Sequence, residues 1–348
     1  TYNGNYGLNA QWTVYNGSKR LKTIEQEKLN NRVANLDVAT SENDIEQSIA
    51  QVYIQILYAA ESVKVNENTL QVSEAQRDRG KQLLDAGSIA RSDYAQLEAQ
   101  VSTDRYQLVT AQATLQDYKL QLKQLLELDG EQEMQVYLPA LGDENVLSPL
   151  PTKTDVFRSA VALRPEIEAS KLSVEASELG IGIAKSGYLP SVSLTAGIGT
   201  NHTSGSDFTF GEQVKNGWNN SIGLSISVPI FNNRQTKSAV EKAKLQYQTS
   251  QLTLLDEQKT LYKTIEGLWL DANSAQQRYA AAIEKLHSTQ TSYELVSEQF
   301  NAGMKNTVEL LTEKNNLLQA QQELLQSKYM AILNTQLLKF YQGDKITL

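Results

Sequence analysis

The chain has 348 residues, of which 32 are basic and 40 acidic, and its formal net charge is −8. An acidic balance argues against general nucleic-acid binding, which needs a basic face. The absence of cysteine excludes thiol catalysis and disulfides, and two histidines are too few for most zinc or copper sites. The mean hydropathy is −0.42 and no apolar run approaches about 18 residues, so the sequence predicts no transmembrane helix. No signal peptide is visible at Thr1.

An alternating segment opens the chain. Its apolar residues are Tyr6, Leu8, Ala10, Trp12 and Val14, and the residues between them are Gly7, Asn9, Gln11 and Thr13. This period of two predicts a β-strand with one apolar and one polar face. Residues 191–199 and 218–230 show the same alternation. Strands of about 10 residues are long enough to cross a bilayer when they are tilted in a barrel.

Helix breakers are scarce outside the middle of the chain, since all six prolines lie between Pro139 and Pro229. Four stretches rich in Ala, Gln, Leu, Glu and Lys predict long helices over residues 18–84, 88–129, 233–302 and 304–342. The first would extend about 100 Å at 1.5 Å per residue. A helix of that length without breakers predicts coiled-coil packing.

Short breaks that contain glycine separate the helices of each pair, at Asp85–Ser88 and at Asn301–Met304. A glycine in the left-handed conformation is a common helix stop. Because each break is short, we expect each pair of helices to form an antiparallel hairpin.

The middle of the chain has a different composition. Residues 131–163 contain prolines and mixed polarity, and a further helix is expected over residues 166–184. Residues 201–217 are rich in Gly, Ser, Asn and Thr, which predicts an exposed hairpin loop with His202 as a solvated residue.

An internal repeat emerges when the sequence is shifted by 216 residues without a gap. Gly7-Leu8 then falls on Gly223-Leu224, Tyr53 on Trp269, and Ala86-Gly87 on Ala302-Gly303. The predicted organisation is a first repeat over residues 1–130, a linking region over 131–163 and a second repeat over 164–348. By the same offset, we expect the first repeat to lack roughly 50 residues at its start, including one strand.

These motifs, taken in order, resemble the TolC family of outer-membrane efflux proteins over essentially the whole chain. The segments that carry the resemblance are the strand end Gly223–Asn232, its weaker counterpart Gly7–Gly17, the Arg164-Pro165 motif within Ala162–Ile167, the strand entry Gly187–Ser191 and the two Ala-Gly turns. In Gly7–Gly17, Trp12-Thr13 stands where the family often has Gln-Pro.

The resemblance implies a mainly helical fold with a small β part. It implies a homotrimer in which twelve strands form an outer-membrane β-barrel and the helical hairpins form a long periplasmic α-barrel. Residues 131–163 would form equatorial structure beside the α-barrel, with a plain linker as the alternative. The implied partners are a periplasmic adaptor (membrane fusion) protein, an inner-membrane transporter and outer-membrane lipid of a Gram-negative bacterium. Conduction would be passive and without a cofactor.

The resemblance also implies a gate at the turns of the hairpins. Glu309 and Thr312 occupy positions at which the family carries inward carboxylates; Thr312 has none. Three copies of Glu309 would form a ring that favours cations and responds to pH. The other gate candidates are Asp93, Ser92, Lys305 and Phe300, the last standing where the family has a tyrosine. The alternative for Asp93 and Glu309 is that each carboxylate stabilises the start of its helix through the helix dipole.

Adaptor docking is expected at the same turns. Leu83 and Gln299 stand where the family has an adaptor-contacting arginine, so other residues must make the contact. The candidates are Gly87, Ser88, Ile89, Ala90, Gly303, Met304, Lys305 and Asn306.

The two alternative classes of protein are an enzyme and a soluble coiled-coil scaffold. No pair of carboxylates stands in a recognisable acid–base setting, so the sequence predicts neither an enzyme nor a catalytic or metal-ligating residue. A soluble coiled-coil scaffold accounts for the helices but leaves three amphipathic strands without a role.

Overall fold

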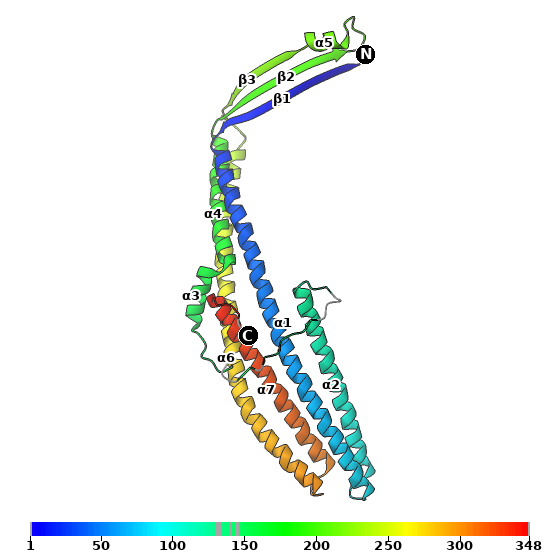
Figure 1. Cartoon of the computed structure of the whole chain (residues 1–348). Helices are drawn as coiled ribbons and strands as arrows, with labels where there is room; N and C mark the ends of the chain where they lie inside the picture. The colour runs from blue at the N-terminus through cyan, green and yellow to red at the C-terminus, as the bar shows by residue number, and fades with distance from the viewer. Residues whose placement is uncertain (1, 130–133, 140, 143–145, 347–348) are drawn as a thin grey trace. The chain divides into compact units, whose positions relative to one another are not determined.

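The structure is a computed structural model that describes residues 2–129, 134–139, 141–142 and 146–346. The prediction of a mainly helical protein with a small sheet is confirmed (Figure 1). Residue 130 and part of the predicted linking region, at residues 131–133, 140 and 143–145, lie outside the described residues. The elements are β1 (Asn3–Asn16), α1 (Lys19–Asp85), α2 (Arg91–Leu125), α3 (Lys153–Leu163), α4 (Pro165–Lys185), a 3₁₀ turn (Ser186–Tyr188), β2 (Ser191–Thr203), α5 (Phe210–Asn216), β3 (Asn219–Ser227), α6 (Gln235–Asn301) and α7 (Thr307–Gln342).

The chain forms two compact units. The first comprises Thr1–Val38 and Pro165–Gln258, and the second comprises Ala39–Arg164 and Lys259–Leu348. The long helices α1 and α6 contribute residues to both units. Each of these helices has 67 residues, and α6 starts and ends 216 positions after α1.

The first unit contains an antiparallel sheet in the order β1-β2-β3. Its register places apolar residues opposite one another, as in the Trp12–Leu194 and Leu194–Leu224 pairs. The small residues Thr195 and Gly223 are paired on the other face. The apolar face is open, since Leu8, Trp12, Ile222 and Leu224 are each at least 60% exposed. Among the described residues, β1 and β3 each pair along one edge only.

One residue of β1 departs from the expected alternation. The register shifts between Thr13 and Tyr15, so that Tyr15, rather than Val14, is paired with Val192 on the apolar face. An inserted residue in one strand is a β-bulge, which leaves one residue unpaired and restarts the alternation one position later. Val14 is the residue that has no partner in this register.

The connection between β2 and β3 is more ordered than a simple loop. It contains α5, whose first turn is capped reciprocally by Thr209 and Glu212. His202 lies in β2, half-buried, with its ring edge-on to that of Phe210 at a centroid distance of 5.0 Å. The expectation that His202 is a solvated loop residue is wrong, because the strand extends further than its apolar alternation.

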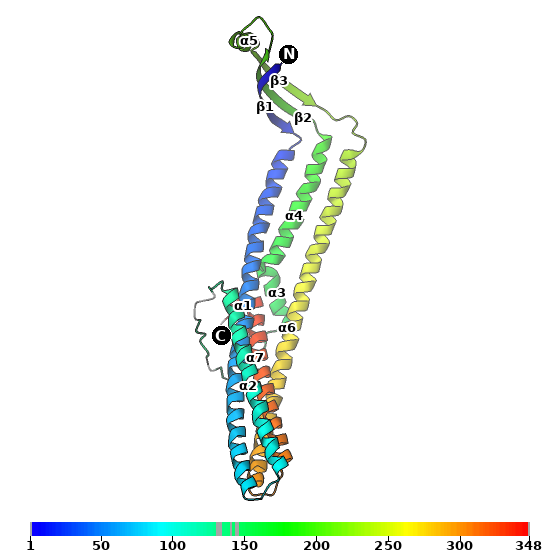
Figure 2. The same cartoon turned by 90° about the vertical axis from the view of Figure 1, so that its right-hand side faces the viewer.

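Helices α1, α4 and α6 lie side by side in the first unit (Figure 2), and polar contacts join them. Gln26 Nε2 donates to the Ala176 carbonyl at 2.7 Å, and the Ser177 and Ser250 hydroxyls lie 2.8 Å apart. Small and amide side chains at these contacts keep the interior of the three-helix group partly polar.

The second unit contains both predicted hairpins, α1–α2 and α6–α7, and their turns lie at the same end (Figures 1 and 2). One buried cluster is built from α1, α6 and α7 around Ile54, Ala275, Tyr279 and Ile332. A second joins α1 to α2 through Val52, Ile56 and Leu122. Burial of these apolar side chains provides the favourable free energy that aligns the helices.

Residues 146–152, which precede α3, are hydrogen-bonded to one side of α6. Gln276 Nε2 donates to the carbonyls of Val146 and Ser148 at 2.8 Å, and Trp269 Nε1 donates to that of Pro151 at 3.0 Å. The Lys153 ammonium lies 4.8 Å from the centroid of the Trp269 ring and 3.1 Å from Glu266 Oε1.

Hydroxyl side chains along α2 bond to their own helix. Four exposed hydroxyls each donate to the carbonyl four residues earlier, at 2.9–3.2 Å: Ser102, Thr103, Thr110 and Thr114. Bonds of this kind are typical of Ser and Thr within helices.

Candidate functional site

The two hairpin turns share one backbone geometry. Gly87 has a φ of +71° and Gly303 a φ of +72°. The glycine N–H bonds to the carbonyl three residues earlier, Leu84 or Phe300, at 2.9 Å, and the next N–H reaches back five residues at 2.8–2.9 Å. This pair of bonds is the Schellman motif, in which the left-handed residue is usually glycine. The predicted glycine stops are therefore confirmed at both turns.

Acidic residues cap the helices that leave the turns. The Ala90 N–H donates to Asp93 Oδ2 at 3.2 Å. At the other turn, the Glu309 N–H donates to Asn306 Oδ1 at 2.9 Å and the Asn306 N–H donates to Glu309 Oε2 at 3.2 Å. This reciprocal arrangement is a capping box, which satisfies two backbone donors at the helix start. Both carboxylates thus have the helix-stabilising role that was the alternative to gating.

Glu309 also has a cationic partner on the same turn. Lys305 Nζ lies 2.5 Å from Glu309 Oε1. Hydrogen bonds from Lys305 and from the Asn306 backbone N–H lower the pKa of the Glu309 carboxyl. A nearby ammonium stabilises the ionised form, so Glu309 keeps its charge to lower pH, while Lys305 offsets part of the field of that charge.

The remaining predicted residues divide between surface and interior. Ser92 and Thr312 are exposed, and the Thr312 hydroxyl donates to the Val308 carbonyl at 2.8 Å. The residues predicted to contact an adaptor lie on or beside the turns, with Ile89 and Lys305 half-buried and Gly87, Ser88, Ala90, Gly303, Met304 and Asn306 exposed.

Phe300 lies inside the bundle, 3% exposed. It belongs to a buried cluster with Leu97 of α2 and Leu310 of α7, and Leu83 and Tyr293 pack against it. This cluster contains residues of both hairpins. Phe300 therefore joins the hairpins by apolar burial, which requires no hydroxyl.

A second link between the hairpins was not predicted from the sequence. Lys314 of α7 forms an ion pair with Asp104 of α2, and Ser73 of α1 bonds to both side chains. All three residues are buried. Their signal in the sequence is the position of Lys314 between Leu310 and Leu317, at spacings of four and three, where a coiled coil places apolar residues.

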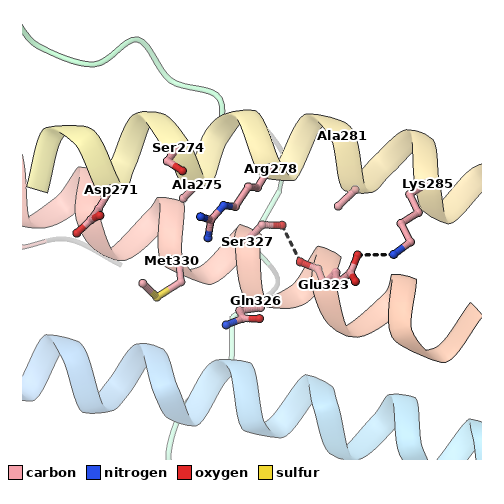
Figure 3. A pocket seen from close by; sticks show the side chains of 11 residues that line it. Asp271, Ser274, Ala275, Arg278, Ala281, Lys285, Glu323, Gln326, Ser327 and Met330 are labelled. Atoms are coloured by element: carbon pink, nitrogen blue, oxygen red, sulfur yellow. Dashed lines mark hydrogen bonds and ion pairs between the residues drawn. The ribbon is translucent and has the colours of Figure 1, made fainter. Parts of the chain in front are cut away.

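A groove of 490 Å³ lies between α6 and α7 (Figure 3). Its walls carry charges of both signs, including Asp271 and Arg278, and the Lys285 ammonium lies 2.7 Å from Glu323 Oε2. Met330 and small side chains such as Ala281 line the rest. The groove is open to solvent and its charges are mixed, so it has no evident preference for one class of ligand.

The described residues contain neither a membrane-spanning helix nor a metal-binding cluster. No described helix is both long enough and apolar enough to cross a membrane. No cluster of three or more His, Cys, Asp or Glu residues suited to a metal ion occurs among the residues that the structure describes.

Comparison with known proteins places these features in a family context. The family model described as outer membrane efflux protein matches residues 156–343. The outer membrane efflux protein BepC of Brucella suis is 24% identical over 84% of this chain and 61% of its own length. The outer membrane protein TolC of Escherichia coli is 24% identical over 94% of this chain and 66% of its own length. The chain thus spans less than two thirds of these two relatives.

Solved structures show the same fold. A crystal structure of CusC superposes with a TM-score of 0.83 at 19% identity, covering 98% of this chain and 77% of that one. The structure of VceC from Vibrio cholerae gives a TM-score of 0.78 at 18% identity, covering 99% and 80%. The agreement extends over both compact units of the chain.

Proposed function

Because the chain belongs to the outer membrane efflux protein family, we propose that it forms a passive exit duct across the outer membrane of a Gram-negative bacterium. The observation that carries this proposal is the sheet of the first unit. It has an apolar face open to its surroundings and two unpaired edges among the described residues. In water, such a sheet would be prone to aggregation. In a closed barrel, the apolar face contacts lipid and the backbone groups of both edges are paired with neighbouring strands.

Closure of that barrel requires several chains. The part of the chain that the structure describes supplies three strands, and single-chain bacterial barrels use at least about eight. We propose a homotrimer with a twelve-stranded barrel, continued by an α-barrel of helical hairpins. The matching lengths of α1 and α6 and their offset of 216 residues support a duplicated unit of strand, helix, turn and helix.

The hairpin turns are the proposed contact with a periplasmic adaptor and, through it, an inner-membrane transporter. Relatives of this chain include a protein named as an alkaline protease secretion protein and another named as part of a cation efflux system. Their names indicate export of very different substrates. We therefore propose that the duct itself is a shared exit and that the pump selects the substrate.

Glu309 is the proposed selectivity residue at the hairpin turns. Three copies would place three carboxylates and three Lys305 ammonium groups around one axis. Since each Lys305 is held against its Glu309, the cation preference of the ring is expected to be modest.

Conductance in planar bilayers tests the proposal. The purified full-length protein is expected to require detergent, to be trimeric and to form cation-preferring channels. Glu309→Gln should reduce the cation-to-anion permeability ratio, whereas Glu241→Gln, which removes a carboxylate paired with Lys244 in the first unit, should leave it unchanged.

The two parts of the proposal fail separately. A full-length protein that stays monomeric and soluble without detergent would contradict the proposal of a duct and favour a coiled-coil scaffold. A trimeric channel whose permeability ratio is the same in Glu309→Gln would retain the duct and remove the selectivity role of Glu309.

A further inference from the structure

Three polar side chains interrupt the apolar seam between the two hairpins. We call the α1–α2 pair the first hairpin and the α6–α7 pair the second. Lys314 of the second is 4% exposed, and Asp104 and Ser73 of the first are each 2% exposed. They form one layer of side chains, which we call the charged layer.

The charged layer occupies positions that a coiled coil reserves for apolar residues. On α7, Lys314 lies between the buried Leu310 and Leu317. On α2, Asp104 follows the buried Leu97 and Val101 at spacings of seven and three. These are the spacings of core positions, so the layer is built into the seam and is not a surface ion pair.

Both carboxylate oxygens of Asp104 accept hydrogen bonds in the charged layer. Asp104 Oδ2 accepts from the Lys314 ammonium and from the Ser73 hydroxyl, and Asp104 Oδ1 accepts from Gln100 Nε2 at 2.9 Å. Burial lowers the pKa of the Lys314 ammonium, and its bond to Asp104 opposes this shift. Each charge of the pair is thus compensated by the other at its buried position.

A buried ion pair is weak evidence for stability, because desolvation offsets the attraction between the charges. The best-attested use of a polar core residue is to fix the register and the partner of a helix. A slip of one turn, about 5.4 Å, would place Lys314 or Asp104 against apolar side chains. Such a mismatch leaves an uncompensated buried charge.

The two hairpins are alike, so pairing between like hairpins of different chains is a competing arrangement. The charges break this likeness. At the offset of 216 residues, Asp104 corresponds to Ala320 and Lys314 to Glu98, so the buried cation occurs in one hairpin and the buried anion in the other. If the first hairpins of two chains paired, their Asp104 side chains would be brought together. If the second hairpins of two chains paired, their Lys314 side chains would be brought together.

We propose that the charged layer of Lys314, Asp104 and Ser73 selects the pairing of the first hairpin with the second and fixes their axial register. The layer specifies the partner and the alignment, while the apolar clusters around it supply most of the stability. This role concerns assembly of the bundle and does not depend on conduction.

Distance measurement between spin labels tests the proposal, and the absence of native cysteine makes labelling specific. Labels are placed on Ser102→Cys of α2 and Asn316→Cys of α7, which are both exposed, with unlabelled chains in excess. The otherwise unchanged protein should give one narrow distance. The double variant Asp104→Leu/Lys314→Met should retain its melting temperature within a few degrees and give a broadened or split distribution, displaced by about one helical turn.

Two comparisons complete the test. The charge-swapped variant Asp104→Lys/Lys314→Asp should recover a single distance, and Lys285→Met, which breaks the exposed pair with Glu323, should leave the distribution unchanged. A folded apolar double variant that keeps the narrow distance overturns the proposal. If the apolar variant does not fold, the swapped variant decides, and a second distance or failure to fold in that variant overturns it.

Discussion

Gly87 and Gly303 reverse the chain at the hairpin turns with a positive φ, and nothing lies within 4 Å of where a Cβ would stand on either residue. A substitution there is therefore opposed by backbone conformation alone. For a residue with a Cβ, the left-handed conformation costs about 1–2 kcal/mol. Gly303→Ala should lower stability by that amount, as measured by thermal unfolding in detergent.

Gly267 provides the matched control for this prediction. It lies within α6, is helical, and also has open space where the methyl group of an alanine would stand. Gly267→Ala should stabilise the protein by about 0.5–1 kcal/mol, because alanine restricts the unfolded chain and suits a helix. Gly303→Asn should cost less than Gly303→Ala, since asparagine tolerates the left-handed region. Equal effects at Gly267 and Gly303 would contradict the argument.

Glu309 makes the start of α7 sensitive to acid. Its pKa is lowered by Lys305 and Asn306 in the folded state, so its stabilising contribution is present above the unfolded pKa of about 4.3. That contribution is lost as the pH falls through the lower, folded pKa. Protection of the Thr307 to Leu311 amides against hydrogen exchange should therefore decrease as the pH is lowered below about 4.

Glu309→Gln is the control for the acid response. Glutamine can complete the capping box but carries no charge, so the same amides should show a protection that is lower at neutral pH and nearly constant on acidification. A wild-type decrease that persists in Glu309→Gln would assign the response to other carboxylates.

At the scale of single residues, the sequence predicted where a residue lies in a helix or turn better than it predicted which distant residues it contacts. The turn glycines and the acidic residues Asp93 and Glu309 follow from local rules about helix ends. Phe300 and Lys314 acquire their roles from residues roughly 200 positions away in the chain. The spacing of Lys314 from Leu310 and Leu317 indicates a core position while its charge favours solvent, and pairing with Asp104 explains its burial.

At the scale of elements, the helices and strands were largely predictable. The scarcity of Gly and Pro predicted α1, α2, α6 and α7 to within a few residues, and strict alternation predicted all three described strands. The bulge in β1 was not predictable, because an extra residue in one strand is defined by the register of the next. The anchoring of the segment before α3 to Trp269 and Gln276 also depends on distant contacts.

At the scale of elements, substitution of Phe300 tests how much apolar burial contributes to the contact between the two hairpins. Phe300→Ala removes a buried aromatic side chain from the cluster with Leu97 and Leu310, and the cost should be about 3–5 kcal/mol. Because the cluster lies near the turns, the loss should appear as faster proteolysis there. Leu295→Ala removes an exposed apolar side chain from the same helix and should stay within about 0.5 kcal/mol.

At the scale of the whole molecule, the sheet has an exposed apolar face and, among the described residues, two edges without a partner strand. Leu224 and Ser225 are neighbours on β3 with side chains on opposite faces, since Leu224 pairs with Leu194 and Ser225 with Ser193. In the proposed barrel, Leu224 faces lipid. Leu224→Arg should disfavour insertion by about 2–4 kcal/mol near the bilayer midplane.

The measurement is the fraction of protein recovered from outer membranes as a heat-dissociable trimer. Leu224→Arg should reduce this fraction strongly, whereas Ser225→Arg, on the polar face, should assemble nearly as well as the unchanged protein. Equal recovery of the two variants would argue that neither face meets lipid.

The hydroxyls of α2 that donate to backbone carbonyls of their own helix differ from free hydroxyls in the hydrogen bonds that they can offer to a small molecule. A hydroxyl has a single hydrogen, and in Ser102, Thr103, Thr110 and Thr114 that hydrogen is already held by a backbone carbonyl. Only the oxygen lone pairs of these groups face the solvent. An ammonium or guanidinium group finds acceptors at these four side chains, while a carbonyl or phosphate group finds no donor in them. These four uncharged groups are thus chemically one-sided towards small molecules.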